Sequence, residues 1–298
     1  MERILFLINT GAGTGMPGNL QQEIDRLSEI HHFRHRVTEL GGQAEVSLKI
    51  RKELDTFNPT IAVAAGGDGT VNLVAAAIMD RETRLAILPL GSSNGMAYQL
   101  GIPDDPEEAL KVLMEGKVQK VDLLEINGER ICLHMADLGM NARVIRRYED
   151  TGMRGFLGYA RQYFRELGNL RRFRFTAETG REKLRSKAVM IVMANASYYG
   201  TGASITPDGR TDDGWFELVV VQAYPYWFLF YMTISILMRN FNHNRFHRIV
   251  RCRKTEIQLD PPQELQIDGE PMGKTAQLQV EIHPGRLQMV VPASVIIH

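Results

Sequence analysis

The chain contains little cysteine. Only two of its 298 residues are cysteines, at positions 132 and 252, and such distant single residues lack the spacing of a metal-binding pattern. A cysteine-based metal site is thereby excluded. We predict Cys132 and Cys252 to be buried thiols of a protein in a reducing compartment.

An excess of charge of either sign is also missing. Lysine plus arginine number 35, aspartate plus glutamate number 35, and the net charge is zero. The chain therefore lacks the overall positive charge that is typical of nucleic-acid-binding proteins. We expect no nucleic-acid partner.

Long hydrophobic runs are absent as well. The longest apolar stretch, 224–238, is shorter than the roughly 20 residues of a membrane-spanning helix. The apolar run at 4–8 is shorter than the hydrophobic region of a signal peptide and leads into glycines. We expect a cytoplasmic protein in which this run is the first strand.

Glycine-bearing turns follow three apolar runs near the N-terminus. The turns are Asn9–Gly15, Gly66–Thr70 and Pro89–Ala97. Glycine leaves room for a phosphate beside the backbone, and a helix N-terminus behind the turn presents free N–H groups. Asp68 is the only charged residue of the second turn. A carboxylate beside a phosphate is reasonable if it binds a metal ion or holds other groups in place.

Strand and helix patterns alternate over residues 1–115. This alternation predicts an α/β domain with a doubly wound, mostly parallel sheet and helices on both faces. Ligands of such sheets bind beyond the carboxyl ends of the strands, where all three turns are expected. The spacing of Leu20, Ile24, Leu27 and Ile30 is helical, and Asp104 or Asp105 with Pro106 marks a helix start. We predict strands at 3–8, 33–38, 60–64 and 85–88, and helices at 19–30, 44–54, 71–79 and 106–115.

From about Val118 the pattern changes to short strands separated by turns. Asn127-Gly128 between two strand-like runs predicts a hairpin, and the remaining runs predict an antiparallel β-sandwich. We therefore expect one domain at 1–124 and a second at 125–298. The predicted strands are 121–126, 131–135, 172–178, 187–194, 215–222, 255–259, 278–282 and 287–291, and the predicted helices are 156–167 and 225–240.

Several motifs stand in a fixed order along the chain. They are Asn9–Gly13, Gly66–Asn72, Pro89–Asn94 with Leu100–Pro103, Tyr198–Gly202, Asp212–Phe216 and Ile267–Glu270. Together they resemble the motifs of the diacylglycerol kinase catalytic-domain family, which includes bacterial diacylglycerol kinases, related lipid kinases and sphingosine kinases. The resemblance covers almost the whole chain.

The resemblance implies ATP- and Mg²⁺-dependent phosphorylation of a lipid hydroxyl, with the active site in a cleft between the two domains. Glu270 matches the general base of the family, and Asp122 matches a carboxylate that joins Asp68 around catalytic magnesium. Another magnesium site is matched by Asp213 together with backbone groups near Arg210 and Trp215. The positions that match the ATP-binding residues are Asn9, Thr10, Gly11, Ala12, Gly13, Thr38, Gly66, Gly67, Asp68, Gly69, Thr70, Val71, Asn72, Ser92 and Asn94.

The residue types permit the same chemistry. Phosphoryl transfer needs positioning, metal charge and a group that orients the attacking hydroxyl, and a glutamate in the turn at 268–271 can accept a hydroxyl proton. Taken alone, Asp-Gly-Glu is also typical of a solvated hairpin loop, and Asp212–Gly214 of a turn before a strand.

Three positions depart from the family pattern. Gly95 and Asn141 stand where the family usually has aspartate, and Gly15 with Met16 stands where many bacterial members have lysine. Each change removes a charge expected near the metal and phosphates. An active but divergent enzyme and a catalytically impaired nucleotide- or lipid-binding regulator both remain open.

Two further alternatives concern substrate and membrane. Gly-Gly-Asp-Gly turns also occur in NAD kinases and phosphofructokinases, so the turn alone permits a soluble substrate. The aromatic run 224–232 and the basic residues after it suit a peripheral contact with the inner membrane face, or a buried helix followed by a solvated strand. A second basic group, at 171–185, is typical of a solvated hairpin. Either basic group could add electrostatic attraction to acidic lipid, even at zero net charge. The particular lipid and the oligomeric state are not readable from these residues.

Overall fold

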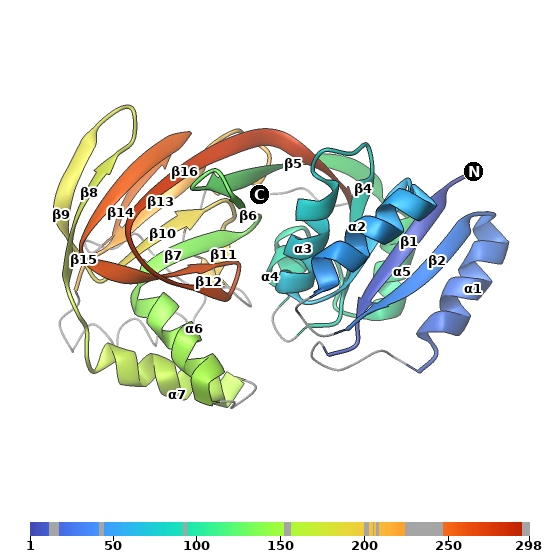
Figure 1. Cartoon of the computed structure of the whole chain (residues 1–298), viewed down its shortest axis with the longest axis horizontal. Helices are drawn as coiled ribbons and strands as arrows, with labels where there is room; N and C mark the ends of the chain where they lie inside the picture. The colour runs from blue at the N-terminus through green and yellow to red at the C-terminus, as the bar shows by residue number, and fades with distance from the viewer. Residues whose placement is uncertain are drawn as a thin grey trace. The chain divides into compact units, whose positions relative to one another are not determined.

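The structure is a computed structural model that describes residues 1–11, 18–41, 45–91, 94–151, 156–199, 203–204, 206, 209–223 and 247–293. The chain forms two compact units, whose elements are labelled in Figure 1. Unit 1 comprises Met1–Val121 and Gly285–His298, and unit 2 comprises Asp122–Pro284.

Unit 1 contains a parallel sheet. Its strands pair in the order β4-β3-β1-β2, and each neighbouring pair is parallel. The strands β1 and β3 are almost entirely buried, as expected for parallel strands covered on both faces. The bounds are β1 Arg3–Asn9, β2 Arg34–Leu40, β3 Ile61–Gly66 and β4 Arg84–Pro89.

Four helices of unit 1 correspond to predicted ones, whereas α4 begins inside the predicted turn at 89–97 and was not predicted. One residue of α1 also differs from its prediction. Leu20, Ile24 and Leu27 of α1 are buried, whereas Ile30 is 55% exposed, so the prediction that Ile30 completes the buried stripe is wrong. Ile30 lies in the last turn, where the helix ends at a left-handed His32. The bounds are α1 Leu20–His31, α2 Val46–Phe57, α3 Asp68–Ile78, α4 Gly95–Gln99 and α5 Pro106–Glu115.

The start of α5 confirms the capping prediction. The Asp105 side chain accepts the N–H of Glu108 at 3.0 Å, and Pro106 occupies the first turn, where no donor is needed.

Unit 2 is built mainly from antiparallel strands. They pair in the order β14-β13-β10-β7-β15-β16. In addition, β8 pairs with β15 and β9 with β8, while β5 pairs with β16 and β6 with β5. The bounds are β5 Lys117–Ile126, β6 Arg130–Cys132, β7 Met135–Gly139, β8 Phe173–Glu178, β9 Lys183–Ala188, β10 Met190–Ala194, β11 Tyr198–Tyr199, β12 Ala203–Ser204, β13 Phe216–Val221, β14 His247–Cys252, β15 Lys254–Ile267 and β16 Glu270–Val291.

Two helices of unit 2 lie in the described part of the chain. The predicted helix at 156–167 is α7, Phe156–Leu167, whereas α6, Met140–Thr151, was not predicted. Its signal is the four-residue spacing of Met140, Val144 and Tyr148, which the surrounding arginines and acids obscure. The predicted helix at 225–240 lies outside the described residues. No helix of the described residues is long and apolar enough to cross a membrane.

The chain returns to unit 1 near its C-terminus. The sequence predicts a boundary between 124 and 125, but the units divide after Val121 and again before Gly285. The long strand β16 accounts for the return, because its first part pairs with β15 while Met289 pairs in parallel with Leu85 of β4. A strand pattern by itself does not show which sheet a strand joins.

The buried side chains of unit 2 include both cysteines. Cys132 and Cys252 are buried free thiols, as predicted, in a core with Phe173, Phe216 and Leu265 among others. Burial raises the pKa of the Cys252 thiol to about 12, since the thiolate would lose its hydration.

Candidate active site

The glycine-bearing turns of unit 1 meet at the carboxyl edge of the sheet, as predicted. Asn9, at the end of β1, donates from its side-chain amide to the hydroxyl oxygen of Thr70 in α3, with an N–O distance of 3.1 Å. The amide oxygen of Asn9 also accepts the N–H of Gly11 at 3.1 Å. Asn9 therefore joins the first turn to the second. Ala12, Gly13 and Ser92 of the predicted ATP site lie outside the described residues.

Close packing against backbone at one position and against a side chain at the other explains two of the glycines. A Cβ atom on Gly91 would lie 2.4 Å from the Cα atom of Gly67, and a Cβ atom on Gly66 would lie 2.4 Å from the hydroxyl oxygen of Thr70. Real side chains do not tolerate such distances. The second and third turns thus approach each other through their main chains, and glycine is needed for that approach.

Asp68 connects the second turn to the third. One carboxylate oxygen accepts the N–H of Gly95 at 2.9 Å, and the other accepts the N–H of Met96 at 3.0 Å. A negative charge at the start of α4 satisfies N–H groups that the helix itself cannot pair. Asp68 was expected either to bind a metal ion or to hold other groups in place. The two hydrogen bonds show that it holds the start of α4 in place. Each oxygen keeps a second lone pair.

The other residues predicted to bind ATP occupy different kinds of position. The side chain of Asn94, which has φ 48°, bonds back to its own turn through the N–H and carbonyl of Gly91. Thr38 was expected after the second strand, but it lies inside β2 and is buried. Val71 is buried in α3, so only its backbone could face a ligand. Their nucleotide contacts, with those of Thr10, Gly69 and Asn72, stay predictions.

Glu270 follows a tight turn between β15 and β16. The turn residues Asp268 and Gly269 have φ values of 47° and 88°, a conformation that suits glycine and is tolerated by aspartate. Partial desolvation and the neighbouring Asp268 carboxylate raise the pKa of Glu270, while the Arg130 guanidinium lowers it. A carboxylate with a raised pKa is a better proton acceptor.

Backbone donors surround the Asp268 carboxylate. It accepts the N–H groups of Leu133 at 2.8 Å and of His134 and Met135 at 3.0 Å. The Cys132 thiol donates to it at 3.2 Å, and burial together with the Asp268 charge raises the pKa of that thiol. Asp268 thus anchors the turn that carries Glu270 to the segment between β6 and β7.

A buried polar chain reaches the same turn from the other side. The N–H of Gly269 donates to the Gln266 side chain at 2.7 Å, and the amide of Gln266 donates to the Asp137 carboxylate at 2.5 Å. The amide of Asn141 donates to that carboxylate oxygen at 2.7 Å. Asp137 is fully buried. One departure from the family pattern thus has a local reason, because the amide of Asn141 supplies a donor that an aspartate would not.

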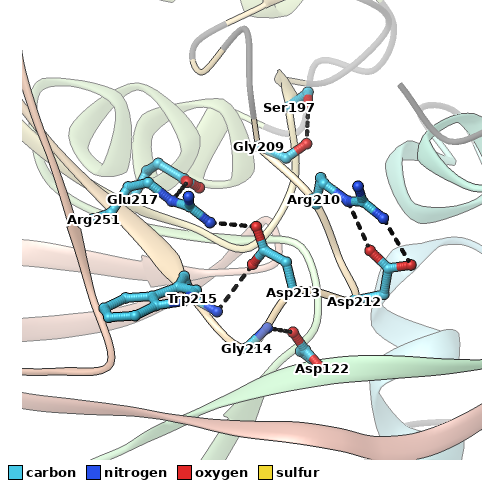
Figure 2. A network of polar contacts seen from close by, with 10 residues as sticks. All are labelled: Asp122, Ser197, Gly209, Arg210, Asp212, Asp213, Gly214, Trp215, Glu217 and Arg251. Carbon is cyan, nitrogen blue, oxygen red and sulfur yellow. Dashed lines mark hydrogen bonds and ion pairs between the residues drawn. The ribbon is translucent and has the colours of Figure 1, made fainter.

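Asp122 holds the Asp-Asp-Gly turn (Figure 2). The residue is only 1% exposed, its carboxylate accepts the N–H of Gly214 at 2.7 Å, and its own N–H donates to the carbonyl of Thr211 at 2.7 Å. Asp122 lies in unit 2 and Asp68 in unit 1. Their expected joint role around catalytic magnesium stays a prediction.

A guanidinium faces the proposed metal ligand Asp213. One carboxylate oxygen accepts the N–H of Trp215 at 3.0 Å and the other pairs with Arg251, which also lies 3.2 Å from Glu217 (Figure 2). Arg210 pairs with Asp212 instead. A metal ion at Asp213 would have to displace Arg251, so these side chains as they lie do not fit one. The magnesium site at Arg210, Asp213 and Trp215 stays a prediction.

Asp68 fits magnesium in another way. Among the described residues, no three histidine, cysteine or acidic side chains are grouped so that they could hold a metal ion. Mg²⁺ is commonly bound by one or two carboxylates, with phosphate oxygens and water completing its shell. The remaining lone pairs of Asp68, at the edge where the three turns meet, suit that arrangement.

Two family descriptions match the chain in succession. The diacylglycerol kinase catalytic domain matches residues 3–126, and the YegS C-terminal NAD kinase beta sandwich-like domain matches residues 135–291. The second match spans more than half of the chain. The chain therefore belongs to the diacylglycerol kinase family of lipid kinases, and both the predicted resemblance and the predicted fold class are confirmed.

Relatives that match over most of their own length are described as probable lipid kinases. A probable lipid kinase YegS-like protein of Serratia proteamaculans is 26% identical over 96% of this chain and 93% of its own. A protein of the same description from Chromohalobacter salexigens is 27% identical over the same shares. A solved putative diacylglycerol kinase from Bacillus anthracis str. Sterne has a TM-score of 0.81 at 22% identity and covers 99% of both chains. This last likeness shows the fold.

Several residues that shape the site were not among the predicted ones. Asp137, Gln266 and Arg251 carry no motif signal, since the bond between Gln266 and Asp137 spans 129 positions and the one between Arg251 and Asp213 spans 38. Asp268 stood inside a recognised motif, yet its partners at 133–135 are not visible from local spacing.

Proposed function

We propose that this protein transfers the γ-phosphoryl group of ATP to the hydroxyl of a lipid. The observation that carries the proposal is the meeting of three glycine-bearing turns at one sheet edge, held together by Asn9 and Asp68. The relatives described as probable lipid kinases support a lipid as the acceptor.

In this proposal unit 1 binds the nucleotide. Backbone N–H groups of the glycine turns and the N-terminus of α3 face the phosphates. Mg²⁺ would neutralise phosphate charge, and Asp68 is the carboxylate that would hold it beside the phosphates. Asn9 and Gly91 keep the turns in contact, so the phosphate-binding backbone is already arranged before ATP arrives.

Glu270 is the proposed general base. Its carboxylate accepts the proton of the lipid hydroxyl as the hydroxyl oxygen bonds to the γ-phosphorus and the bond to ADP breaks. Two features support this role. The pKa of Glu270 is raised, and Asp268 and Gln266 hold its turn in place from two sides.

A lipid panel tests the proposal. Purified protein is given radiolabelled ATP, Mg²⁺ and mixed micelles of diacylglycerol, phosphatidylglycerol or ceramide, with EDTA as a metal-free control. We expect labelled lipid with at least one of them. In Glu270→Gln, kcat should fall by about 10²–10⁴-fold, the usual contribution of a general base, with little change in ATP binding.

Glu281→Gln is the matched control. Glu281 is an exposed residue of the same strand, paired with Lys254, and its loss should leave kcat unchanged. Turnover of NAD or a sugar phosphate with no labelled lipid would overturn the lipid assignment. Wild-type rates in Glu270→Gln would overturn the role of Glu270.

A further inference from the structure

Two neighbouring hollows on unit 2 are lined by basic side chains. The first, of about 550 Å³, is lined by five arginines and a lysine, and the second, of about 530 Å³, by three arginines and a lysine. Arg172 lines both, so the hollows adjoin. The cations of the first are Arg143, Arg146, Arg147, Arg171, Arg172 and Lys274, and the second adds Arg174, Arg185 and Lys187.

Helix geometry and two buried acids fix the inner cations. Arg143, Arg146 and Arg147 are three and four positions apart on α6 and so share one face. Glu166, only 1% exposed, pairs with Arg143 at 2.8 Å and with Arg147, and the buried Glu264 pairs with Arg146. These pairs hold the guanidinium groups in defined positions.

The outer cations lack such partners. Within the described part of the chain, Arg171, Arg172, Arg174, Arg185, Lys187 and Lys274 form no ion pair. Arg174 on β8 stands directly opposite Lys187 on β9, and like charges directly opposite one another destabilise a sheet. The nearest acid across the other strand pair, Asp260 opposite Arg174, makes no ion pair with it. Positive charge therefore predominates here, although Asp150 also lines the first hollow.

One donor also points to a missing acceptor. The Nη2 atom of Arg143 is buried and has no hydrogen-bond partner among the described residues. An unpaired buried guanidinium donor is costly, and an anion in the first hollow would supply the acceptor. Planar guanidinium groups match phosphate oxygens in particular.

We infer that this double hollow is a docking surface for the phosphate headgroups of an anionic membrane. Two adjoining sites suit a surface on which phosphates repeat. No aromatic side chain of the described residues lines either hollow, so a nucleotide base would find no stacking partner. The surface is distinct from the glycine turns of unit 1 and from Glu270, and the inference concerns where the protein binds, not what it phosphorylates.

Vesicle binding tests the inference without ATP. Sedimentation is measured with vesicles of phosphatidylcholine alone and with vesicles in which one third of the lipid is phosphatidylglycerol. The wild-type protein should bind only the anionic vesicles, and less as salt rises. The triple variant Arg171→Gln, Arg172→Gln and Lys274→Gln should partition about a hundredfold more weakly, since each basic side chain contributes to attraction at such a surface.

The matched control removes equal charge elsewhere on unit 2. Lys183→Gln, Arg248→Gln and Lys254→Gln are exposed, lie outside both hollows and should retain wild-type binding. All six side chains are exposed, so circular dichroism and Tm should match wild type in both variants. An equal loss of vesicle binding in both variants would overturn the inference. So would a wild-type protein that does not bind anionic vesicles but binds glycerol phosphate in calorimetry or retains RNA.

Discussion

Asp268 and Met135 bind each other in both directions. The N–H of Asp268 donates to the carbonyl of Met135 at 2.9 Å, and the N–H of Met135 donates to the Asp268 carboxylate at 3.0 Å. The two residues are 133 positions apart. This reciprocal contact, extended by the N–H groups of Leu133 and His134, fixes the turn that carries Glu270.

Loss of the Asp268 carboxylate should loosen that turn. Asp268→Ala leaves three backbone donors without their charged acceptor, at a cost of about 2 kcal/mol or more. We expect faster hydrogen exchange in the peptide that contains residues 133–135, and a lower kcat with unchanged ATP affinity. Glu256→Ala, an exposed acid of β15, is the control. Unchanged protection of 133–135 would contradict the anchoring role.

The pH dependence of catalysis should respond to Arg130. Glu270 must be deprotonated to accept a proton, so activity falls as the pH drops through its raised pKa. The Arg130 charge lowers that pKa, and Arg130→Gln should therefore move the acidic limb of kcat/KM to higher pH.

Lys254→Gln removes a comparable charge that pairs with Glu281, and its pH profile should match wild type. A limb that moves to lower pH in Arg130→Gln, or that stays in place, would count against Glu270 as the titrating base. The raised pKa of Glu270 also makes the stability of the folded state depend on pH. Because folding raises this pKa, the contribution of Glu270 favours the folded state at low pH and is lost as the group ionises.

Three glycine-to-alanine substitutions should destabilise the protein in the order of how little space lies beside each glycine. A Cβ atom added to Gly18 would have no neighbour within 4 Å. One added to Gly67 would lie 3.3 Å from the Cα atom of Gly91, and one added to Gly91 would lie 2.4 Å from the Cα atom of Gly67. Gly91→Ala should cost about 1–3 kcal/mol by forcing the turns apart, and should weaken ATP binding most. Thermal unfolding and titration calorimetry check the order. A Gly91→Ala protein as stable as Gly18→Ala would show that the turns do not pack this closely.

Asn141→Asp should destabilise the protein near neutral pH. The change removes the donor to Asp137 and places a second carboxylate beside it, which costs about 2 kcal/mol or more. Like charges raise one another's pKa, so the deficit should shrink as the pH falls and one group takes up a proton. In Asn141→Ala the hydrogen bond is lost without added charge. Because the ionised Asp137 has lost a donor in both variants, urea denaturation across pH should show a pH-dependent deficit in both, and the larger one for the aspartate.

Much of unit 1 could be predicted because its signals are local. A buried parallel strand is a continuous apolar run, a helix shows its stripe at Leu20, Ile24 and Leu27, and the glycine turns follow the strands directly. The convergence of the turns also follows, since parallel strands end at one edge. The error at Ile30 arose because spacing shows a helical face but not where the neighbouring element ends.

The sequence by itself determined the family, the α/β unit, the mainly antiparallel unit and the order of the motifs. Tertiary structure alone decided what holds the candidate groups. It paired Asp213 with Arg251, placed the amides of Gln266 and Asn141 on Asp137, and surrounded Asp268 with N–H groups of 133–135. The physical reason is the distance along the chain over which each kind of interaction acts. Strand and helix periods depend on a few neighbouring residues, whereas a buried carboxylate takes its donors from whichever strands the fold brings together.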